Sequence, residues 1–415
     1  MAATFFAHET GAAALVMIAL LSVSCTTERV DMQASLPPRQ EPREAPSRID
    51  ADEIFSRPIG QRVGTSFAAN VRFFTEPLGA IPYDNETLPL VSPDGRFLAT
   101  QTGLAPGLET VLAQPGAAIP ASSRIEIHAL PDAPDQSPTM IAVVDQPALL
   151  GRSCRDDGFL IEAARENGAR WIGLVSWETG RTTWLIDDDQ AVSAFASLGP
   201  GGQLAFSRRP LNGSGFSLTV RLAGQQWSFP ADQGDWLMPT WSGLGDGLFA
   251  LLLRGDMLDA VHMIATDAST ARRTLRIQPL ATSEANRNIA FRTLNSVVNL
   301  PGGPAPARHE LFFFHPAHRA AALWRPPDPP AVFQRHSFVA VADHNDPRSM
   351  LLMTDRQLFW QNIGSTPDRV ELMRGAHVPR PTASAERPYI LLNPGDGVIN
   401  LTVLRFLPPD QPIGE

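Results

Sequence analysis

A short turn-and-strand pattern recurs along this chain and limits the folds that it can adopt. The clearest copy is the turn Ser92-Pro93-Asp94-Gly95, which leads into the apolar run Phe97-Leu98-Ala99. Pro, Asp and Gly favour tight turns, and an apolar run directly after a turn is typical of a buried strand. Weaker copies begin at Asp156, Gly201 and Gly245. The pattern therefore indicates repeated β-units.

The length of the repeat follows from aligning the apolar runs that come after these turns. Seven anchor positions are spaced by 62, 45, 44, 63, 39 and 39 residues, namely Phe97, Phe159, Leu204, Leu248, Leu311, Met350 and Tyr389. Most of these spacings suit a four-stranded propeller blade. We predict an all-β fold with a single β-propeller over residues 69–407. Seven blades are expected, six or eight are alternatives, and the last three anchors are placed mainly by spacing.

Two further features support a closed ring. The best repeat unit covers residues 171–207, where four short strands are separated by turns such as Glu178-Thr179-Gly180. Residues 70–75 and 397–407 read as strands that lie before the first anchor and after the last one. Pairing them in one blade would close the ring and remove two exposed sheet edges.

The pattern of short strands, with Ser-Pro-Asp-Gly between two of them, resembles the TolB-type, WD-like β-propeller repeat of bacterial envelope proteins. The resemblance covers roughly residues 69–407 and is clear in three or four units. It implies a fold and no particular activity, because propellers carry many unrelated functions. There is no Gly-x-Ser-x-Gly motif and no hydrolase domain after the propeller, so a resemblance to propeller-bearing prolyl peptidases ends at the fold.

The N-terminal segment resembles the signal of a bacterial lipoprotein. Residues 11–23 are small and apolar, a run too short to span a bilayer, and they precede Ser24-Cys25. Ser22 and the lack of Arg or Lys in residues 1–11 depart from that pattern. We predict a signal peptide over 1–24, lipidation at Cys25, a Pro-rich tether over 25–68 and a tail over 408–415. A plain cleaved signal peptide and a buried helix are the alternatives.

Composition excludes several kinds of site. The net charge is −9 and no basic stripe is present, which argues against nucleic-acid binding. All 34 basic residues are Arg, so neither a Schiff-base lysine nor a Gly-Lys-Ser/Thr phosphate loop can form. Cys25 and Cys154 are the only cysteines, which excludes a disulfide framework and a four-cysteine zinc site within one chain.

Four features could carry chemistry, and each has a simpler structural interpretation. Residues 179–184 resemble the tryptophan-docking motif of quinoproteins, although Thr-Gly turns with a packing Trp occur in propellers of all kinds. His309, Glu310, His315 and His318 could share a metal only with residues from another blade, and solvated turn histidines are favoured. Asp187-Asp188-Asp189 lacks the alternating ligands of a calcium loop, and a solvated turn is favoured. Trp236 could be a binding anchor, but core packing is favoured.

We assign no catalytic, cofactor-binding or metal-binding residue from the sequence. The favoured function is a non-catalytic, protein-binding propeller, monomeric and held by its lipid at the periplasmic side of the outer membrane. The alternatives are a secreted or soluble periplasmic protein, and a hydrolase, lyase or quinoprotein-like enzyme with its site in the central channel. The two long spacings place extra chain within 103–149 and 255–308, where a partner-binding surface could be added at little cost in stability.

Overall fold

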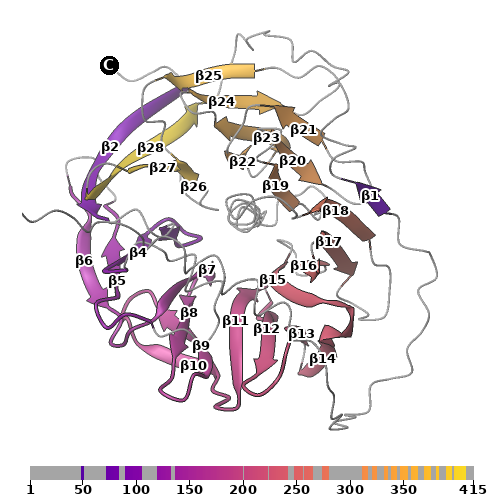
Figure 1. Cartoon of the computed structure of the whole chain (residues 1–415). Helices are drawn as coiled ribbons and strands as arrows, with labels where there is room; N and C mark the ends of the chain where they lie inside the picture. Colours follow the sequence, from indigo (N-terminus) through magenta and orange to yellow (C-terminus); the bar gives the residue numbers. More distant parts are fainter. Residues whose placement is uncertain are drawn as a thin grey trace, which may run out of the picture.

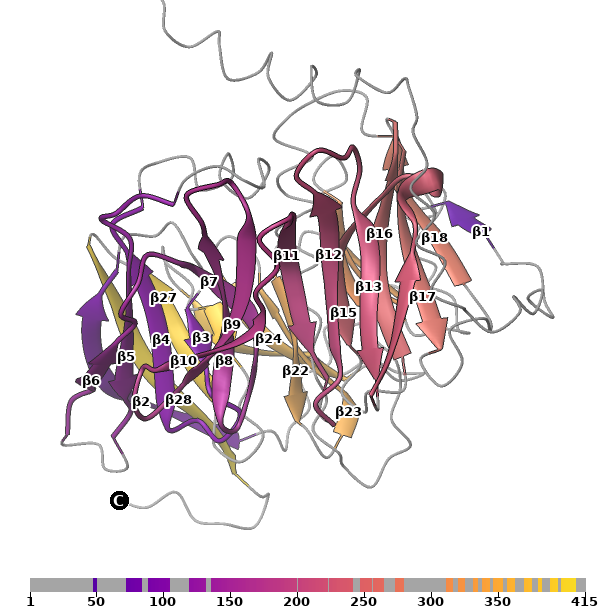
Figure 2. The same cartoon turned by 90° about the horizontal axis from the view of Figure 1, so that it is seen from below.

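The computed structural model shows a ring of small β-sheets (Figure 1). In the perpendicular view the strands of each sheet run between the two faces of the ring (Figure 2). The described residues are 48–50, 72–83, 89–104, 119–131, 136–199, 201–222, 224–241, 247–255, 257–264, 273–279, 311–315, 320–324, 331–334, 338–343, 346–353, 357–362, 369–374, 380–382, 389–394 and 397–407. The ring and its antiparallel sheets make the fold a β-propeller, as the sequence predicts.

The first half of the ring contains three consecutive four-stranded sets. They are β3 (Leu90–Val91), β4 (Phe97–Thr102), β5 (Arg124–Ala129) and β6 (Thr139–Val143); β7 (Leu149–Arg155), β8 (Gly158–Ala164), β9 (Arg170–Ser176) and β10 (Thr182–Ile186); and β11 (Ala191–Leu198), β12 (Leu204–Pro210), β13 (Ser217–Leu222) and β14 (Gln225–Phe229). The second and third sets join through one parallel contact between Val192 and Arg170. A short 3-10 helix, η1 (Ala231–Gln233), follows β14.

The second half continues the series. Its strands are β15 (Asp235–Trp241), β16 (Gly247–Arg254), β17 (Met257–Ile264) and β18 (Arg273–Pro279), with β1 (Arg48–Asp50) added beside β18; β19 (Leu311–His315), β20 (Ala320–Trp324) and β21 (Ala331–Gln334); β22 (Phe338–Asp343), β23 (Asp346–Met353), β24 (Gln357–Asn362) and β25 (Arg369–Arg374); and β26 (Arg380–Thr382), β27 (Tyr389–Pro394), β28 (Val398–Leu407) and β2 (Arg72–Pro82). Residues 280–310 lie outside the described chain, so the count of seven blades stays a prediction.

The segments near the two ends of the chain share one sheet. β2 pairs antiparallel with β28 over ten residue pairs, from Arg72 with Leu407 to Pro82 with Val398. On its other side β28 pairs with β27. β28 therefore lies between two strands, one from each end of the propeller sequence, as Figure 1 also shows.

The unit that looked best in the sequence, residues 171–207, is not one blade. β9 and β10 are the third and fourth strands of one antiparallel set, whereas β11 and β12 begin the next set. The strands and turns are where the sequence places them, but the boundary between blades falls at Asp187-Asp188-Asp189. A polar loop between two blades has the same composition as a turn inside one, so composition does not distinguish them.

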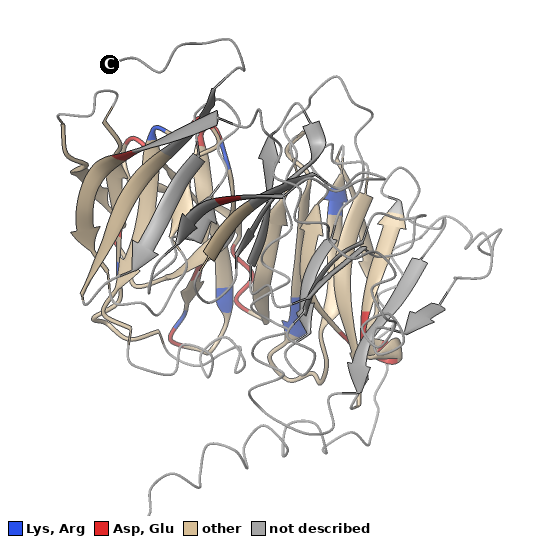
Figure 3. Ribbon diagram, turned by 90° about the horizontal axis from the view of Figure 1, so that it is seen from above, with Lys and Arg blue, Asp and Glu red and all other residues tan. Residues whose placement is uncertain are grey.

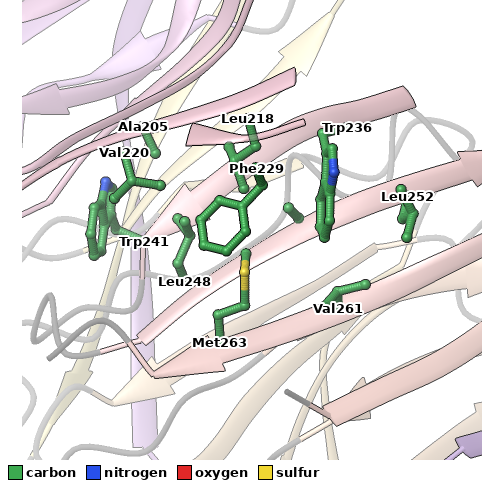
Figure 4. Close-up of a cluster of buried hydrophobic side chains, with 11 residues drawn as sticks. Ala205, Leu218, Val220, Phe229, Trp236, Trp241, Leu248, Leu252, Val261 and Met263 are labelled. Atoms are coloured by element: carbon green, nitrogen blue, oxygen red, sulfur yellow. The ribbon is translucent and has the colours of Figure 1, made fainter. Parts of the chain in front are cut away.

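Apolar side chains gather between neighbouring blades. The cluster between the β11–β14 and β15–β18 blades is shown in Figure 4, and its members are Ala205, Leu218, Val220, Phe229, Trp236, Trp241, Leu248, Ala250, Leu252, Val261 and Met263. Trp236 is 1% exposed, and its Nε1 donates to the Pro230 carbonyl oxygen at 3.2 Å. Trp236 is therefore a core residue, and the alternative that it serves as a binding anchor is wrong.

Polar side chains fasten successive blades to one another. Gln101 of β4 accepts the Leu150 N–H at 2.8 Å through Oε1. Ser153 of β7 accepts the Leu198 N–H at 2.9 Å, and Ser197 of β11 accepts the Trp241 N–H at 3.2 Å. In each case a side chain of one blade holds the first strand of the next. Such hydrogen bonds contribute about 1 kcal/mol each and fix the blades in register.

The first strands β7, β11 and β15 each contain an irregularity in their pairing with the second strand. In β11 and β15 it coincides with a non-glycine residue of positive φ, Phe195 at 56° and Met238 at 48°. This conformation costs an L-residue about 1–2 kcal/mol, so the surrounding contacts must hold it. Its occurrence at the same place in two successive blades makes it a property of the repeat.

Candidate functional site

The strands β7, β11 and β15 begin at one face of the ring, which we call the leading face. β8 ends there, because Leu149 at the start of β7 is paired with Glu162 near the end of β8. The leading face therefore carries the loops between second and third strands, including 103–123, 165–169 and 211–216. Figure 3 shows that described charged residues lie largely at strand ends and loops. The candidate site is the part of this face formed by β8 to β15.

A buried ion pair lies beneath this face. Arg170 is 0% exposed, and its Nη1 lies 3.2 Å from Oε2 of Glu162, itself 6% exposed. The other carboxylate oxygen, Oε1, accepts the N–H of Phe195 at 2.5 Å. Glu162 thus joins its own blade to the positive-φ residue of the next blade. These contacts assign the pair a structural role in holding the β7–β10 blade against β11.

The predicted acidic turn lies on the same face, between the end of β10 and the start of β11. Oδ2 of Asp188 lies 2.6 Å from Nη2 of Arg208, and its Oδ1 accepts the Gln190 N–H at 2.8 Å. Burial acts to raise the pKa of Asp188, but the hydrogen bonds and the Arg208 charge outweigh it and lower that pKa. The turn is therefore a fixed connection between blades, with Asp188 ionised at neutral pH.

An aromatic and charged group flanks the turn. Oδ1 of Asp189 accepts the indole N–H of Trp171 at 3.1 Å. The Arg165 guanidinium lies over the Trp171 ring, 4.0 Å from its centroid. Trp171 also meets Trp184 edge-on, with ring centroids 5.2 Å apart. Trp171 is partly exposed, so this group gives the leading face an aromatic contact with a cation above it.

A second arginine lies over an aromatic ring further along the same face. The Arg209 guanidinium lies 5.1 Å from the Phe216 ring centroid. Burial lowers the pKa of Arg209, the nearby Asp235 acts to raise it, and the charge of Arg170 lowers it further. Oδ1 of Asp235 also accepts the Phe216 N–H at 2.6 Å. The leading face from β8 to β15 therefore alternates cations, carboxylates and aromatic rings.

The ends of the first long insertion are fastened together on the leading face. Ser122 Oγ donates to the Gly103 carbonyl oxygen at 2.6 Å, and the backbone of Ser122 approaches Gly103 so closely that no side chain fits there. Gln101 Nε2 donates to Ser123 Oγ at 2.7 Å and to the Ala148 carbonyl oxygen at 2.6 Å. The longest connection within the predicted excess 103–149 is therefore 103–123, because β5, β6 and the start of β7 leave only the shorter connections 130–138 and 144–148.

The second predicted insertion, 255–308, also contains blade strands. β17 and β18 lie within it, and residues 280–308 lie outside the described chain.

Several site residues considered from the sequence also lie outside the described chain, namely Cys25, His309, Glu310 and His318. His315 is the last residue of β19. Within the described residues no group of three or more His, Cys, Asp or Glu side chains could hold a metal ion. The described part of the chain also has no helix of the length and hydrophobicity of a membrane span.

The structure brings together a polar group that the sequence analysis missed. Thr100, Glu126 and His128 meet between β4 and β5, and His128 is 3% exposed. Thr100 Oγ1 and Glu126 Oε2 each lie 3.5 Å from the same ring nitrogen, Nε2. A nucleophile–base–acid relay needs the hydroxyl and the carboxylate on opposite nitrogens. This group therefore lacks the geometry of a catalytic triad.

Cys154, the one cysteine among the described residues, has its thiol directed at the neighbouring blade. Its Sγ donates to the Val91 carbonyl oxygen of the preceding blade at 3.4 Å. Burial, with smaller contributions from Asp156 and Asp94, raises the pKa of this thiol to about 12. A thiol with that pKa is protonated at neutral pH and is a poor nucleophile.

We predict that His128 makes stability fall in mildly acidic solution. Burial lowers its pKa below the ordinary value, and Glu126 offsets this only in part. The unfolded chain therefore takes up the proton more readily than the folded one. The free energy of unfolding is unaffected by His128 above about pH 6.5 and decreases as the pH falls below that value. Urea midpoints at pH 7.5 and 5.5 test this. His128→Gln should reduce the difference, and an unchanged difference would contradict the prediction.

Comparisons with known proteins add little to this picture. The sequence matches no protein-family model, and a comparison with curated proteins gives no match. Among solved structures, a Mycobacterium tuberculosis puromycin-hydrolyzing peptidase is similar at a TM-score of 0.33 and 16% identity, over 54% of this chain and 34% of that one.

Two other solved structures are also similar to this chain. The WD40 domain of Toxoplasma gondii coronin has a TM-score of 0.43 and 13% identity, over 85% of this chain and 91% of that one. A TolB structure from Agrobacterium tumefaciens has a TM-score of 0.31 and 12% identity, over 81% and 99%. This chain spans about a third of the length of the peptidase. The likenesses carry no argument about function.

Proposed function

We propose that this protein is a non-catalytic propeller that binds a protein partner in the bacterial cell envelope. The fastened base of residues 103–123 carries the proposal. Gln101, Ser122 and Ser123 tie both ends of this insertion to β4 and to the start of the next blade. A loop with fixed ends costs little stability and presents a surface at a defined place.

The contacts on the rest of the leading face agree with a binding role. Asp188 and Glu162 carry carboxylates that hold arginines and backbone N–H groups of adjoining strands. Trp171, with Arg165 above its ring, is a partly exposed aromatic of the kind found at binding surfaces. The partner would thus meet a rigid, polar face with one aromatic contact next to the insertion.

Shortening the insertion tests the proposal. Residues 105–118 are replaced by a four-residue Gly/Ser link, and proteins cross-linked to the chain in intact cells are identified by mass spectrometry. Replacing residues 132–135, which belong to the β5–β6 connection at the opposite face, is the matched control. We expect the first variant to lose its cross-linked partners and the control to keep them. Equal partner sets for two folded variants would overturn the proposal and favour a channel-based activity.

We also propose that Cys25 is the lipidated first residue of the mature protein, on the periplasmic side of the outer membrane. The apolar run 11–23 and the small residue Ser24 support this. Mass spectrometry of the membrane fraction should find a diacylglyceryl group on Cys25. Cys25→Ser should leave the signal uncleaved and the lipid absent. Recovery of soluble protein that begins at another residue would contradict the lipid anchor.

A further inference from the structure

The outer edge of the β15–β18 blade is covered by a strand from a distant part of the sequence. β1, residues Arg48–Asp50, pairs parallel with β18, and Figure 1 shows it outside the ring beside that strand. More than 220 residues separate the two strands in sequence. β1 belongs to the segment 25–68 that the sequence predicts to be a tether.

Among the described strands this arrangement distinguishes one blade from the others. The outermost strands β6, β14, β21 and β25 each end their sheet, whereas β18 has β1 on its outer side. An outer strand exposes unpaired N–H and C=O groups that can accept another extended segment. Addition of a short extended segment to such an edge is a known mode of recognition between chains.

The register places an apolar residue of β1 opposite an apolar residue of β18, and an acidic residue opposite a basic one. Ile49 is opposite Leu275, which is opposite Ala260 of β17. Asp50 is opposite Arg276, and Arg276 is opposite Asp259. Across the three strands β1, β18 and β17, Arg276 is therefore aligned with one aspartate on each side. A slip of the β1 register by one residue would break both alignments.

The sequence around β1 limits the pairing to a short segment. Pro46 lies two residues before Arg48 and has no N–H to donate to a neighbouring strand. The strand therefore begins two residues after a proline. Arg48–Asp50 places an apolar residue between two charged ones, a pattern that Arg29-Val30-Asp31 of the same tether shares.

From these observations we infer that residues 48–50 are a latch, which docks the tether on the outer edge of β18. The latch occupies a site for an extended peptide strand and sets the point from which the rest of the tether leaves the propeller. This inference does not depend on lipidation or on the partner proposed above. The occupant of the β18 edge is the chain's own tether.

Disulfide trapping in the full-length chain tests the register. The chain carries Cys25→Ser and Cys154→Ala, and Ile49→Cys is combined with Leu275→Cys. Facing positions on adjacent strands lie about 5 Å apart, within the range that a disulfide bridges. The matched control combines Asp50→Cys with Thr274→Cys, which a register offset of two residues separates by about 8 Å. Mild oxidation followed by peptide mass spectrometry gives the two rates of bond formation.

We expect the facing pair to form its intramolecular disulfide at least tenfold faster than the offset pair. Equal rates, or no bond in the facing pair of a folded protein, would overturn the latch. Hydrogen exchange in the otherwise unaltered chain gives a second measurement if the cysteine pairs fail to fold. Ile49→Pro should speed exchange in residues 273–279 at least tenfold while β16 is unchanged, and the control Ala34→Pro should have no effect. Parent-like exchange in Ile49→Pro would also overturn the latch.

Discussion

A chain that lacks residues 397–415 is expected to lose cooperative folding. The deletion removes β28, which pairs with β2 over ten residue pairs and with β27 over six. It also removes Ile399, Leu401 and Val403, which are 0%, 1% and 7% exposed. Burying such side chains contributes about 1.5–3 kcal/mol each. Their sum alone approaches the whole stability of an ordinary domain, about 5–15 kcal/mol.

The matched control removes only residues 408–415, the predicted tail. We expect this shorter deletion to unfold at the parent's temperature, whereas the longer one aggregates or gives no cooperative transition in thermal scans followed by circular dichroism. Loss of β28 leaves the edges of β2 and β27 unpaired, which favours association between chains. If the chain without 397–415 melts as the parent does, β28 is not needed to close the ring.

Replacing Glu162 by Leu is expected to destabilise the protein by about 3–5 kcal/mol, the usual effect of removing one member of a buried ion pair. Arg170 is 0% exposed, so its charge stays buried when the Glu162 carboxylate is gone. The same substitution removes the acceptor for the Phe195 N–H. Urea unfolding followed by tryptophan fluorescence measures the free energy.

Two controls separate charge from packing at this site. Glu162→Leu combined with Arg170→Met removes both charges, and we expect it to recover much of the loss, because apolar replacements of a buried pair are often nearly neutral. Asp188→Asn alters the partly exposed pair with Arg208 and should cost at most about 1 kcal/mol. A Glu162→Leu effect as small as that of Asp188→Asn would show that the buried pair does not hold the blades together.

The fold was largely readable from the sequence because turn chemistry is local. Phe97, Leu204 and Tyr389 are the first residues of β4, β12 and β27, the second strands of their sheets. Phe159, Leu248 and Met350 also lie in second strands. Leu311 opens β19, whose position within its blade depends on residues outside the described chain. Spacing without a clear turn was therefore enough to place Met350 and Tyr389 in second strands.

The candidate site was harder to predict, because its partners are far apart in sequence. Asp188 was noticed as part of an acidic run, but its contact with Arg208 required the fold. Glu162 did leave a signal, a lone carboxylate in the otherwise apolar strand Gly158–Ala164. Nothing local marks Phe195 for a positive φ, since its strand reads as ordinary apolar β-sequence. The conformation and the partners of such residues are set by contacts with distant parts of the chain.

The side chains that join successive blades also bear on how a ring like this can be rearranged. Ser153 accepts the backbone N–H of Leu198, and Ser197 accepts that of Trp241. We call each such hydrogen bond a clamp, and its two members belong to successive blades. A blade copied or exchanged by itself would bring half of each clamp and leave the other half in its neighbours. Both members of each clamp lie on first strands, so a graft keeps a clamp whole only if it carries two successive first strands. The smallest unit of recombination that does so is one complete blade together with the first strand of the next.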